Sequence, residues 1–402
     1  MKYTISMARF LLLTHIYPPA IDGGSKVIAK MGEYLQKHGH KILVVTTNCT
    51  STDDFASIRH SSVRQGEGDP NIIRLPVITL FHRPFKFLGR YFPNFKTLSK
   101  GPIFYLRNFL KIIYLTKKFK PDFILAGPLP TTMVLYARFL RYLSTHLLHC
   151  SPKLIINASF HPTDPDFQTP ILLNTLKSAE YIWTLTDFET NYFHQKLNIP
   201  QNKLINLGNG VDNSFLSSTP LLNYSYINLL FIGSFSAHKD IPTLIKAFSN
   251  LPEKYTLTLA GQKTLYYPVI KKQINSLPPP IKKRLKIISN FNNSDLSTLL
   301  GNCSILISPS LQESFGLVLI EAMARSRPVI AANIPASTEL ISKSKGGLIF
   351  KAGDATDLKN IILKLSSSPK LFNSLSKNGF NYVSTHYTWD KIGEGLCQKL
   401  HI

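Results

Sequence analysis

Short apolar runs alternate with helix-like stretches along the whole chain, and this alternation constrains the fold most. At the start, the apolar run Arg9–Thr14 is followed by a loop at 17–24, a helix predicted over Ser25–Lys37 and a second apolar run at Lys41–Thr46. Continuous apolar runs of this length are typical of strands buried on both faces of a parallel sheet, so the segment predicts a βαβ unit. Further strands are predicted at Ile72–Leu75, Phe123–Ala126, Lys153–Asn157 and Tyr181–Leu185.

The second half repeats the alternation. Its strands are predicted at Ile227–Ile232, Thr256–Ala260, Leu285–Ile288, Ser304–Ile307, Val329–Ala331 and Gly347–Phe350. Its helices are predicted near Pro242–Ser249, Ser294–Leu300, Gly316–Arg325 and Thr356–Leu365, with Pro278-Pro-Pro280 as a stiff loop. We therefore expect an α/β protein with two Rossmann-like, doubly wound domains facing a central cleft. The domains are expected over 1–210 and 211–380, with a C-terminal helix over 381–402 that packs back toward the first.

Composition narrows the class of protein. The 402 residues include 46 Lys and Arg against 23 Asp and Glu, a net charge of +23, and four scattered cysteines. Because no CxxC pair occurs, a disulfide scaffold or zinc ribbon is not expected, and the cysteine usage fits a reducing compartment. No apolar run reaches the roughly 18 residues of a membrane-spanning helix, and Arg9 interrupts the apolar start. We therefore expect a cytoplasmic protein without a secretory signal.

Much of the positive charge lies between residues 81 and 120. This strip holds ten basic and eleven aromatic residues, and no acidic residue lies between Asp69 and Asp122. Basic residues mixed with aromatic rings favour an anionic membrane surface, and hence a peripheral position on the inner face of the cytoplasmic membrane. A helix over Ile103–Phe119 with a solvated basic face, or single-stranded nucleic acid stacked on the rings, stays open. No nucleic-acid-binding module accompanies the strip, so nucleic acid is not expected as a partner.

Gly23-Gly24 stands between the first strand and its helix. Glycines at this place let backbone amides approach a phosphate at a helix N-terminus, although many βα turns contain glycine for geometry alone. The pair is not the GxGxxG fingerprint of nicotinamide enzymes.

The segment 308–324 leaves a strand, crosses a loop and enters a helix at about Phe315–Gly316. Glu313 precedes that helix, and Glu321 is embedded among its apolar residues, where a carboxylate needs hydrogen bonds. Sugar hydroxyls are suitable donors, and the amides of Phe315, Gly316 and Leu317 are suited to hold a phosphate. In the alternative, Glu313 is only a helix-entry residue and Glu321 pairs with a neighbouring arginine.

Lys239, with His238 beside it, follows a glycine-containing turn after the strand that ends at Ile232. A cation at the carboxyl end of a strand suits a diphosphate leaving group, although a surface lysine would give the same pattern.

Together these motifs resemble the retaining nucleotide-sugar glycosyltransferases of family 4, which have the GT-B fold. The resemblance runs from about residue 8 to Trp389-Asp390 and is most specific in the second half. Its matching features are Tyr17-Pro-Pro, Gly23-Gly24, His38-Gly-His40, Asn209-Gly-Val-Asp212 with Phe215, the turn Gly233–Lys239, the pair Glu313 and Glu321, Glu339, Gly347-Leu-Ile-Phe and Gly353-Asp354.

The resemblance implies an acceptor-binding first domain and a donor-binding second domain. Catalysis would depend on Glu313 at the transferred sugar, Lys239 at the diphosphate, and His161 facing the reacting sugar. The resemblance implies that no metal or other cofactor is required. Donor-binding residues would be Gly23, Gly24, Gly233, Ser234, His238, Phe315, Gly316, Leu317 and Glu321.

Three departures from the family pattern stand out. Ser234 replaces the usual arginine of the donor loop, Ser326 replaces a glycine at a helix exit, and Pro335-Ala336 replaces a Gly-Gly. Asp164-Pro-Asp166 is similar to a metal-binding DxD pair, a pattern that also arises by chance in loops.

We therefore expect transfer of a sugar from a nucleotide diphosphate sugar to a glycan or lipid-linked acceptor, with retention, in cell-envelope glycan, lipopolysaccharide or glycolipid synthesis. Two alternatives remain: a catalytically weakened protein that binds polyanions or membrane surfaces, and a sugar-nucleotide epimerase.

Overall fold

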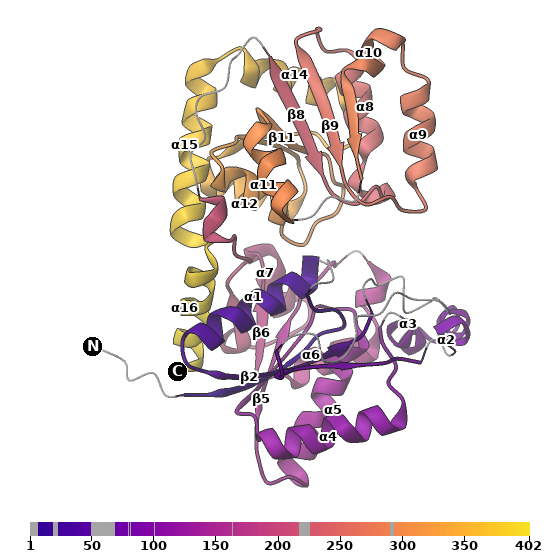
Figure 1. The fold of residues 1–402 in the computed structure, drawn as a ribbon, viewed down its shortest axis with the longest axis vertical. Coiled ribbons are helices and arrows are strands. Elements are labelled where there is room, and N and C mark those ends of the chain that lie inside the picture. The colour runs from indigo at the N-terminus through magenta and orange to yellow at the C-terminus, as the bar shows by residue number, and fades with distance from the viewer. Residues whose placement is uncertain are drawn as a thin grey trace. The chain divides into compact units, whose positions relative to one another are not determined.

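Two parallel sheets organise the chain, as the ribbon of the computed structural model shows (Figure 1). The structure describes residues 7–18, 23–49, 69–78, 80, 82–99, 101–162, 164–216, 226–289 and 293–402. The chain divides into two units: Met1–Gly208 with Ile392–Ile402, and Asn209–Lys391. Each sheet lies within one unit.

The first unit contains a seven-stranded sheet in the order β3-β2-β1-β4-β5-β6-β7, with all paired strands parallel. Its strands are β1 (Arg9–Leu13), β2 (Lys41–Thr47), β3 (Ile72–Leu75), β4 (Phe123–Ala126), β5 (Lys153–Asn157), β6 (Tyr181–Thr184) and β7 (Leu204–Asn206). Its helices are α1 (Gly23–Lys37), α2 (His82–Leu88), α3 (Pro93–Leu98), α4 (Leu106–Phe119), α5 (Thr132–His146), α6 (Pro170–Ser178) and α7 (Asp187–Gln195).

The second unit contains a six-stranded parallel sheet in the order β10-β9-β8-β11-β12-β13. Its strands are β8 (Ile227–Ile232), β9 (Tyr255–Ala260), β10 (Leu285–Ile288), β11 (Ile305–Ser308), β12 (Val329–Ala332) and β13 (Gly347–Phe350). Its helices are α8 (Ile241–Ser249), α9 (Tyr267–Asn275), α10 (Pro279–Lys283), α11 (Asn293–Asn302), α12 (Leu317–Ala324), α13 (Pro335–Ser344), α14 (Ala355–Ser366) and α15 (Pro369–His386). Helix α8 packs beside α9 and α14, and α12 beside α15 (Figure 1).

Most strand residues are apolar, as expected where helices cover both faces of a parallel sheet. Every residue of β4 is buried, and the same holds for β11 and β12. Each unit has its own buried core. This agrees with the two Rossmann-like domains predicted from the two alternating halves of the sequence.

Helix α16 (Trp389–Leu400) begins in the second unit and ends in the first, because Ile392–Ile402 group with the first unit. The residue at which the C-terminal helix was expected to start, 381, falls inside α15. The stiff loop predicted at 278–280 is wrong: α10 begins at Pro279, because proline fits the first turn of a helix, where its missing N–H is not needed.

Candidate functional site

Lys239 and Glu313 form an ion pair in the second unit. Lys239 ends a short 3₁₀ turn (Ala237–Lys239) after β8, and Glu313 lies in the loop after β11. Strands β8 and β11 are parallel neighbours, so their carboxyl ends bring two residues 74 positions apart to the same edge of the sheet. The side chains are only 17% and 16% exposed. Two residues that the sequence singled out separately therefore form one charged pair.

Backbone contacts hold the two loops of this pair in place. The N–H of Leu311 donates to the carbonyl of His238 over 2.8 Å, which joins the loop of Glu313 to the turn of Lys239. The N–H of Phe235 donates to the Gln262 carbonyl over 2.9 Å, and the Phe235 side chain is fully buried. The lysine and the carboxylate are thus presented by anchored loops.

Ser234, in the position of the family's arginine, bonds within its own turn. Its Oγ lies 3.0 Å from the Oγ of Ser236, which in turn lies 3.3 Å from Nδ1 of the exposed His238. Gly233 precedes it, and the backbone approach there is close: a β-carbon on Gly261 would lie 1.7 Å from the Gly233 carbonyl oxygen. Position 261 therefore admits only glycine unless this turn moves.

The start of α12 is shaped by a left-handed residue. Gly316 has a φ of 90°, and α12 begins at the next residue, Leu317. Phe315 is buried with its ring edge-on to Tyr387 at 5.3 Å between centroids. Glu321 lies in the middle of α12 and is 6% exposed. The segment from Glu313 to Glu321 thus runs from the loop after β11 into α12, which begins just after the predicted entry at Phe315–Gly316.

Ser326 has a left-handed backbone, with a φ of 56°, just after α12. Helices commonly end on such a residue, and glycine adopts this conformation at least cost. This geometry explains the glycine that the family pattern carries at this position.

In the first unit, Gly23 and Gly24 begin α1, two residues earlier than predicted. A β-carbon on Gly24 would lie 2.4 Å from Cγ of Pro128. Close packing against the loop after β4 is therefore enough to require glycine at position 24. The predicted approach of a phosphate to this amide would be a second reason. Residues 19–22 of this loop lie outside the described residues.

His161 is half-buried in the loop after β5. Its ring lies edge-on to Phe167 at 5.3 Å, and its carbonyl accepts the N–H of Asp164 over 3.1 Å. The Asp164 carboxylate caps the short 3₁₀ helix Pro165–Phe167 by accepting the N–H of Asp166 over 2.9 Å. Asp164 thus has a structural task here. Within the described ranges, no group of three or more His, Cys, Asp and Glu side chains is arranged to hold a metal ion.

Arg74 was missed by the sequence analysis because it stands inside an apolar strand. It is 6% exposed, and its guanidinium donates to the carbonyls of Tyr17, over 3.3 Å, and Pro18. Desolvation lowers the pKa of Arg74. Burial has the opposite effect on an acid that becomes negatively charged, and it raises the pKa of the Tyr17 hydroxyl to about 12. The arginine fixes the start of the loop that leads to Gly23.

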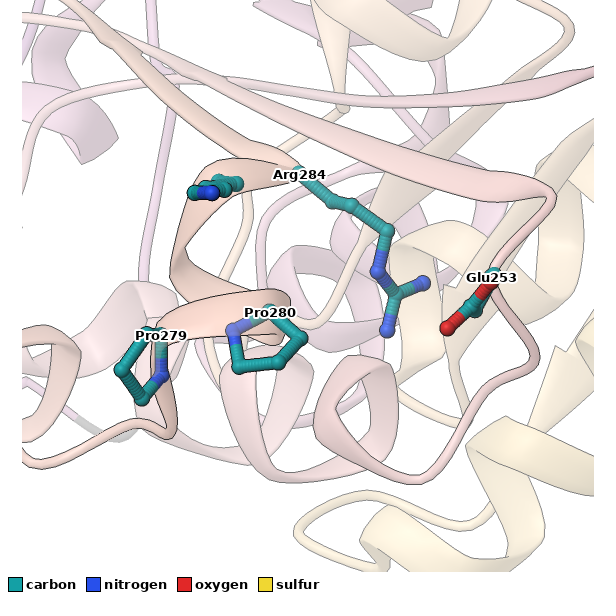
Figure 2. Close-up of a pocket in the computed structure, with 5 residues that line it drawn as sticks. Glu253, Pro279, Pro280 and Arg284 are labelled. Atoms are coloured by element: carbon teal, nitrogen blue, oxygen red, sulfur yellow. The ribbon is translucent and has the colours of Figure 1, made fainter.

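A hollow of about 400 Å³ near the start of β10 is a different kind of site (Figure 2). Its Arg284 donates to the carbonyls of Pro252 and Tyr255 over 2.8 and 2.9 Å and lies over the Phe248 ring. The guanidinium is thus used to hold a turn together. Arg284 also precedes β10, so it lies at the amino edge of the sheet, away from Lys239 and Glu313.

Comparison with known proteins assigns the second unit. Residues 219–382 match the family model of glycosyl transferases group 1. The second unit is a glycosyl transferases group 1 domain. Lys239, Glu313 and the other residues predicted in the second unit all lie inside this group 1 domain.

Two curated relatives of the chain are named glycosyltransferases. An uncharacterised glycosyltransferase of Methanocaldococcus jannaschii is 29% identical over 49% of this chain and 53% of its own length. The O-antigen chain mannosyltransferase RfbU of Salmonella typhimurium is 24% identical over 55% of this chain and 60% of its own. The chain thus spans a little over half the length of these two relatives.

Solved structures match almost the whole chain, including the group 1 domain. Sucrose-phosphate synthase from Thermosynechococcus elongatus has a TM-score of 0.74 at 19% identity, covering 97% of this chain and 98% of its own. Anabaena HepE, solved with UDP and glucose, has a TM-score of 0.72 at 17% identity, covering 98% and 99%. These likenesses confirm the GT-B fold predicted from the sequence.

Proposed function

We propose that this protein transfers a sugar from a nucleotide diphosphate sugar to an acceptor hydroxyl with retention of configuration. The observation that carries the proposal is the ion pair of Lys239 and Glu313 within the group 1 domain. A cation and a carboxylate at the carboxyl edge of a parallel sheet, where such folds bind ligands, are suited to the two halves of a sugar diphosphate.

In this proposal, Lys239 stabilises the charge that develops on the leaving diphosphate, aided by the amides at Phe315–Leu317. Glu313 accepts hydrogen bonds from the hydroxyls of the transferred sugar, and Glu321 from those of the ribose. The bond between the anomeric carbon and the phosphate breaks, and the acceptor hydroxyl oxygen bonds the anomeric carbon on the face from which the phosphate departs, which gives retention. The leaving phosphate takes the acceptor's proton. In the proposal, His161 acts on the reacting sugar and the amides of Gly23 and Gly24 bind the diphosphate. The scheme requires no metal.

Two relatives support the choice of substrates. HepE was solved with UDP-glucose, which supports a nucleotide diphosphate sugar as donor. RfbU is named an O-antigen chain mannosyltransferase, which supports a hexosyl donor and a glycan or lipid-linked acceptor of the cell envelope. The donor's base and sugar are for the experiment to identify.

The test is a panel of nucleotide sugars incubated with the protein, with and without glycan and lipid-linked acceptors, followed by mass spectrometry. We expect a glycosylated acceptor with the donor's anomeric configuration by NMR. Lys239→Ala is expected to reduce kcat/KM about 10²–10³-fold, the effect of removing one donor to a developing oxyanion. Conversion of the donor without an acceptor would indicate an epimerase instead. Transfer that survives both Lys239→Ala and Glu313→Ala unchanged would exclude this site.

We also propose that the first unit docks on an anionic membrane surface, such as the cytoplasmic leaflet. The observation is an exposed stripe on α4: Leu106, Leu110 and Tyr114 follow at four-residue intervals and are 73%, 55% and 63% exposed. Arg107 and Lys111 are exposed beside them. The outward face of α4 is therefore apolar as well as basic, unlike a merely solvated face.

The strip predicted over 81–120 forms two separate surfaces. Helix α4 packs on α5, whereas α2 and α3 pack on each other and α3 packs on α6, and Figure 1 shows the two groups apart within the unit. On the second surface Phe87, Tyr91 and Phe92 are more than half exposed. Phe81 and Lys100 lie outside the described residues. None of the described helices is long and apolar enough to cross a bilayer.

Flotation with vesicles tests the docking. Salt-sensitive flotation with anionic but not neutral vesicles would support the docking, and equal flotation with both kinds of vesicle would exclude it.

A further inference from the structure

A buried carboxylate that the proposed reaction does not use lies in the first turn of α7. Glu189 is 2% exposed. The spacing of Thr186 and Glu189 is that of a capping box, in which the glutamate would accept the N–H of the cap residue itself. Thr186 does cap α7, accepting the N–H of Glu189 over 3.0 Å. The Glu189 carboxylate, however, accepts hydrogen bonds from residues that follow the two neighbouring strands.

The two oxygens of Glu189 join two loops at the carboxyl edge of the first sheet. Oε2 accepts the N–H of Leu185, just after β6, over 2.5 Å. Oε1 accepts the N–H of Phe160, in the loop after β5, over 2.7 Å. A buried carboxylate is costly unless it is hydrogen-bonded, so these two bonds fix the distance between the loops.

The loop bound by Glu189 is the one that carries His161. Ser159, two residues before it, has a left-handed φ of 43°, a conformation that needs support from its surroundings. The Phe160 ring packs against Phe193 and Phe167, with centroids 4.9 and 5.5 Å away, and Phe167 also contacts the His161 ring. The backbone at Phe160 and the ring of Phe167 together set where the imidazole points.

We propose that Glu189 is a positioning residue for His161, holding the loop after β5 so that the imidazole meets the reacting sugar. The inference rests on the proposed function, which gives His161 its role. Misplacing a reacting group by about 1 Å costs up to about 10²-fold in rate, so a lost anchor one residue away has a measurable effect.

The main variant is Glu189→Gln, which keeps the shape and replaces one acceptor oxygen with a donor. We expect kcat to fall between about 10- and 100-fold with little change in the KM for the donor. The matched control is Glu180→Gln. The Glu180 carboxylate pairs with Arg141 and accepts the N–H of Leu154 over 2.7 Å, at the opposite end of β5 from His161. The control variant should retain its kcat.

A double-mutant cycle separates positioning from general destabilisation. If Glu189 acts through His161, Glu189→Gln with His161→Ala is no slower than His161→Ala alone. If the fold reductions in kcat of the two single variants multiply in the double variant, the proposal is overturned. Should Glu189→Gln fail to fold, Glu189→Asp, which keeps the carboxylate but shortens its reach, is measured in the same cycle.

A second readout does not need activity. The imidazole carbon–proton resonance of His161, assigned with His161→Ala, is expected to shift in Glu189→Gln and to stay in place in Glu180→Gln. If no donor supports transfer, the proposed function has failed and this resonance still decides whether Glu189 positions His161. An unshifted resonance would overturn the inference even in an active enzyme.

Discussion

Substitutions in the ion pair of Lys239 and Glu313 distinguish effects on stability from effects on activity. Both side chains are mostly buried, so removing one leaves the other charge without its partner. Lys239→Met is expected to lower the free energy of unfolding in urea by about 1–3 kcal/mol. Lys239→Met with Glu313→Gln should recover most of this loss and remain inactive. Lys272, exposed on α9, supplies the control Lys272→Met, which should change neither property.

The left-handed backbone at Ser326 gives a second prediction. A residue with a β-carbon costs about 1–2 kcal/mol in this conformation, partly offset by the larger unfolded-state entropy of glycine. Ser326→Gly should therefore raise the free energy of unfolding by about 0.5–1 kcal/mol. Ser384→Gly, inside α15, is the control and should lower it. A destabilised Ser326→Gly would show that the side chain makes a contact worth more than the strain.

At the scale of elements, strands were predicted more reliably than helices. Phe123–Ala126 matches β4 residue for residue, because a strand buried on both faces is one continuous apolar run. Leu285–Ile288 also matches β10, although the exposed Lys286 interrupts the apolar run there. The helices that were missed include α10, α13 and α15, each of which begins with proline. At 278–280 the prolines were interpreted as a stiff loop, although the fixed φ of proline also suits the first helical turn.

A prediction at this scale concerns the link between β1 and β4. The backbone N–H and the guanidinium of Arg9 donate to the carboxylate of Asp122, just before β4. Burial alone would raise the pKa of the Asp122 carboxyl, but the hydrogen bonds and charge of Arg9 outweigh burial and lower this pKa from its ordinary value. A carboxyl whose pKa is lower in the folded state adds stability above its unfolded pKa, and this is lost as the pH falls through the folded pKa.

Asp122→Asn should therefore lower the free energy of unfolding at pH 7, by less than about 1 kcal/mol because the pair is partly exposed. The difference in free energy of unfolding between the variant and the wild type should shrink as the pH falls below about 4, where the Asp122 carboxyl of the wild type begins to be protonated. Urea unfolding at pH 7 and pH 3 measures both values. Glu33→Gln, which breaks the Lys30 pair within α1, is the comparison and should change stability by only a few tenths of a kcal/mol. An equal deficit at both pH values would contradict the linkage.

For the whole molecule, the alternation of strands and helices predicted two doubly wound domains, whereas the joint role of Lys239 and Glu313 was implied only by the resemblance to the family. The sequence did not reveal the hydrogen bond from the N–H of Phe160 to Glu189, since no pattern in it pairs a helix cap with a loop 29 positions away. It also presented the basic strip as one surface, because proximity in sequence does not show that α4 turns away from α2 and α3.

Two surfaces should contribute separately to vesicle binding. Leu106→Ser with Leu110→Ser on α4, and Phe87→Ser with Phe92→Ser on the other surface, are each expected to weaken flotation with anionic vesicles. The combined variant should weaken it further. Leu265→Ser, which removes a fully exposed leucine from the second unit, is the control. Binding that responds to one pair only would assign the docking to that surface alone.

Helix α16 has a consequence for how genes of this type can recombine. The first unit is made from both ends of the chain, and Gly393 in its last segment lies so close to Tyr34 that a β-carbon would come within 2.2 Å of the ring. A single crossover near 208 would join this Tyr34 to a foreign last segment, whose residue at the position of Gly393 must also be glycine. Exchanging a whole unit with a relative therefore requires two breakpoints, after Gly208 and after Lys391. A chimera built with a single breakpoint carries a clash with Tyr34 wherever the foreign segment has a residue other than glycine at position 393.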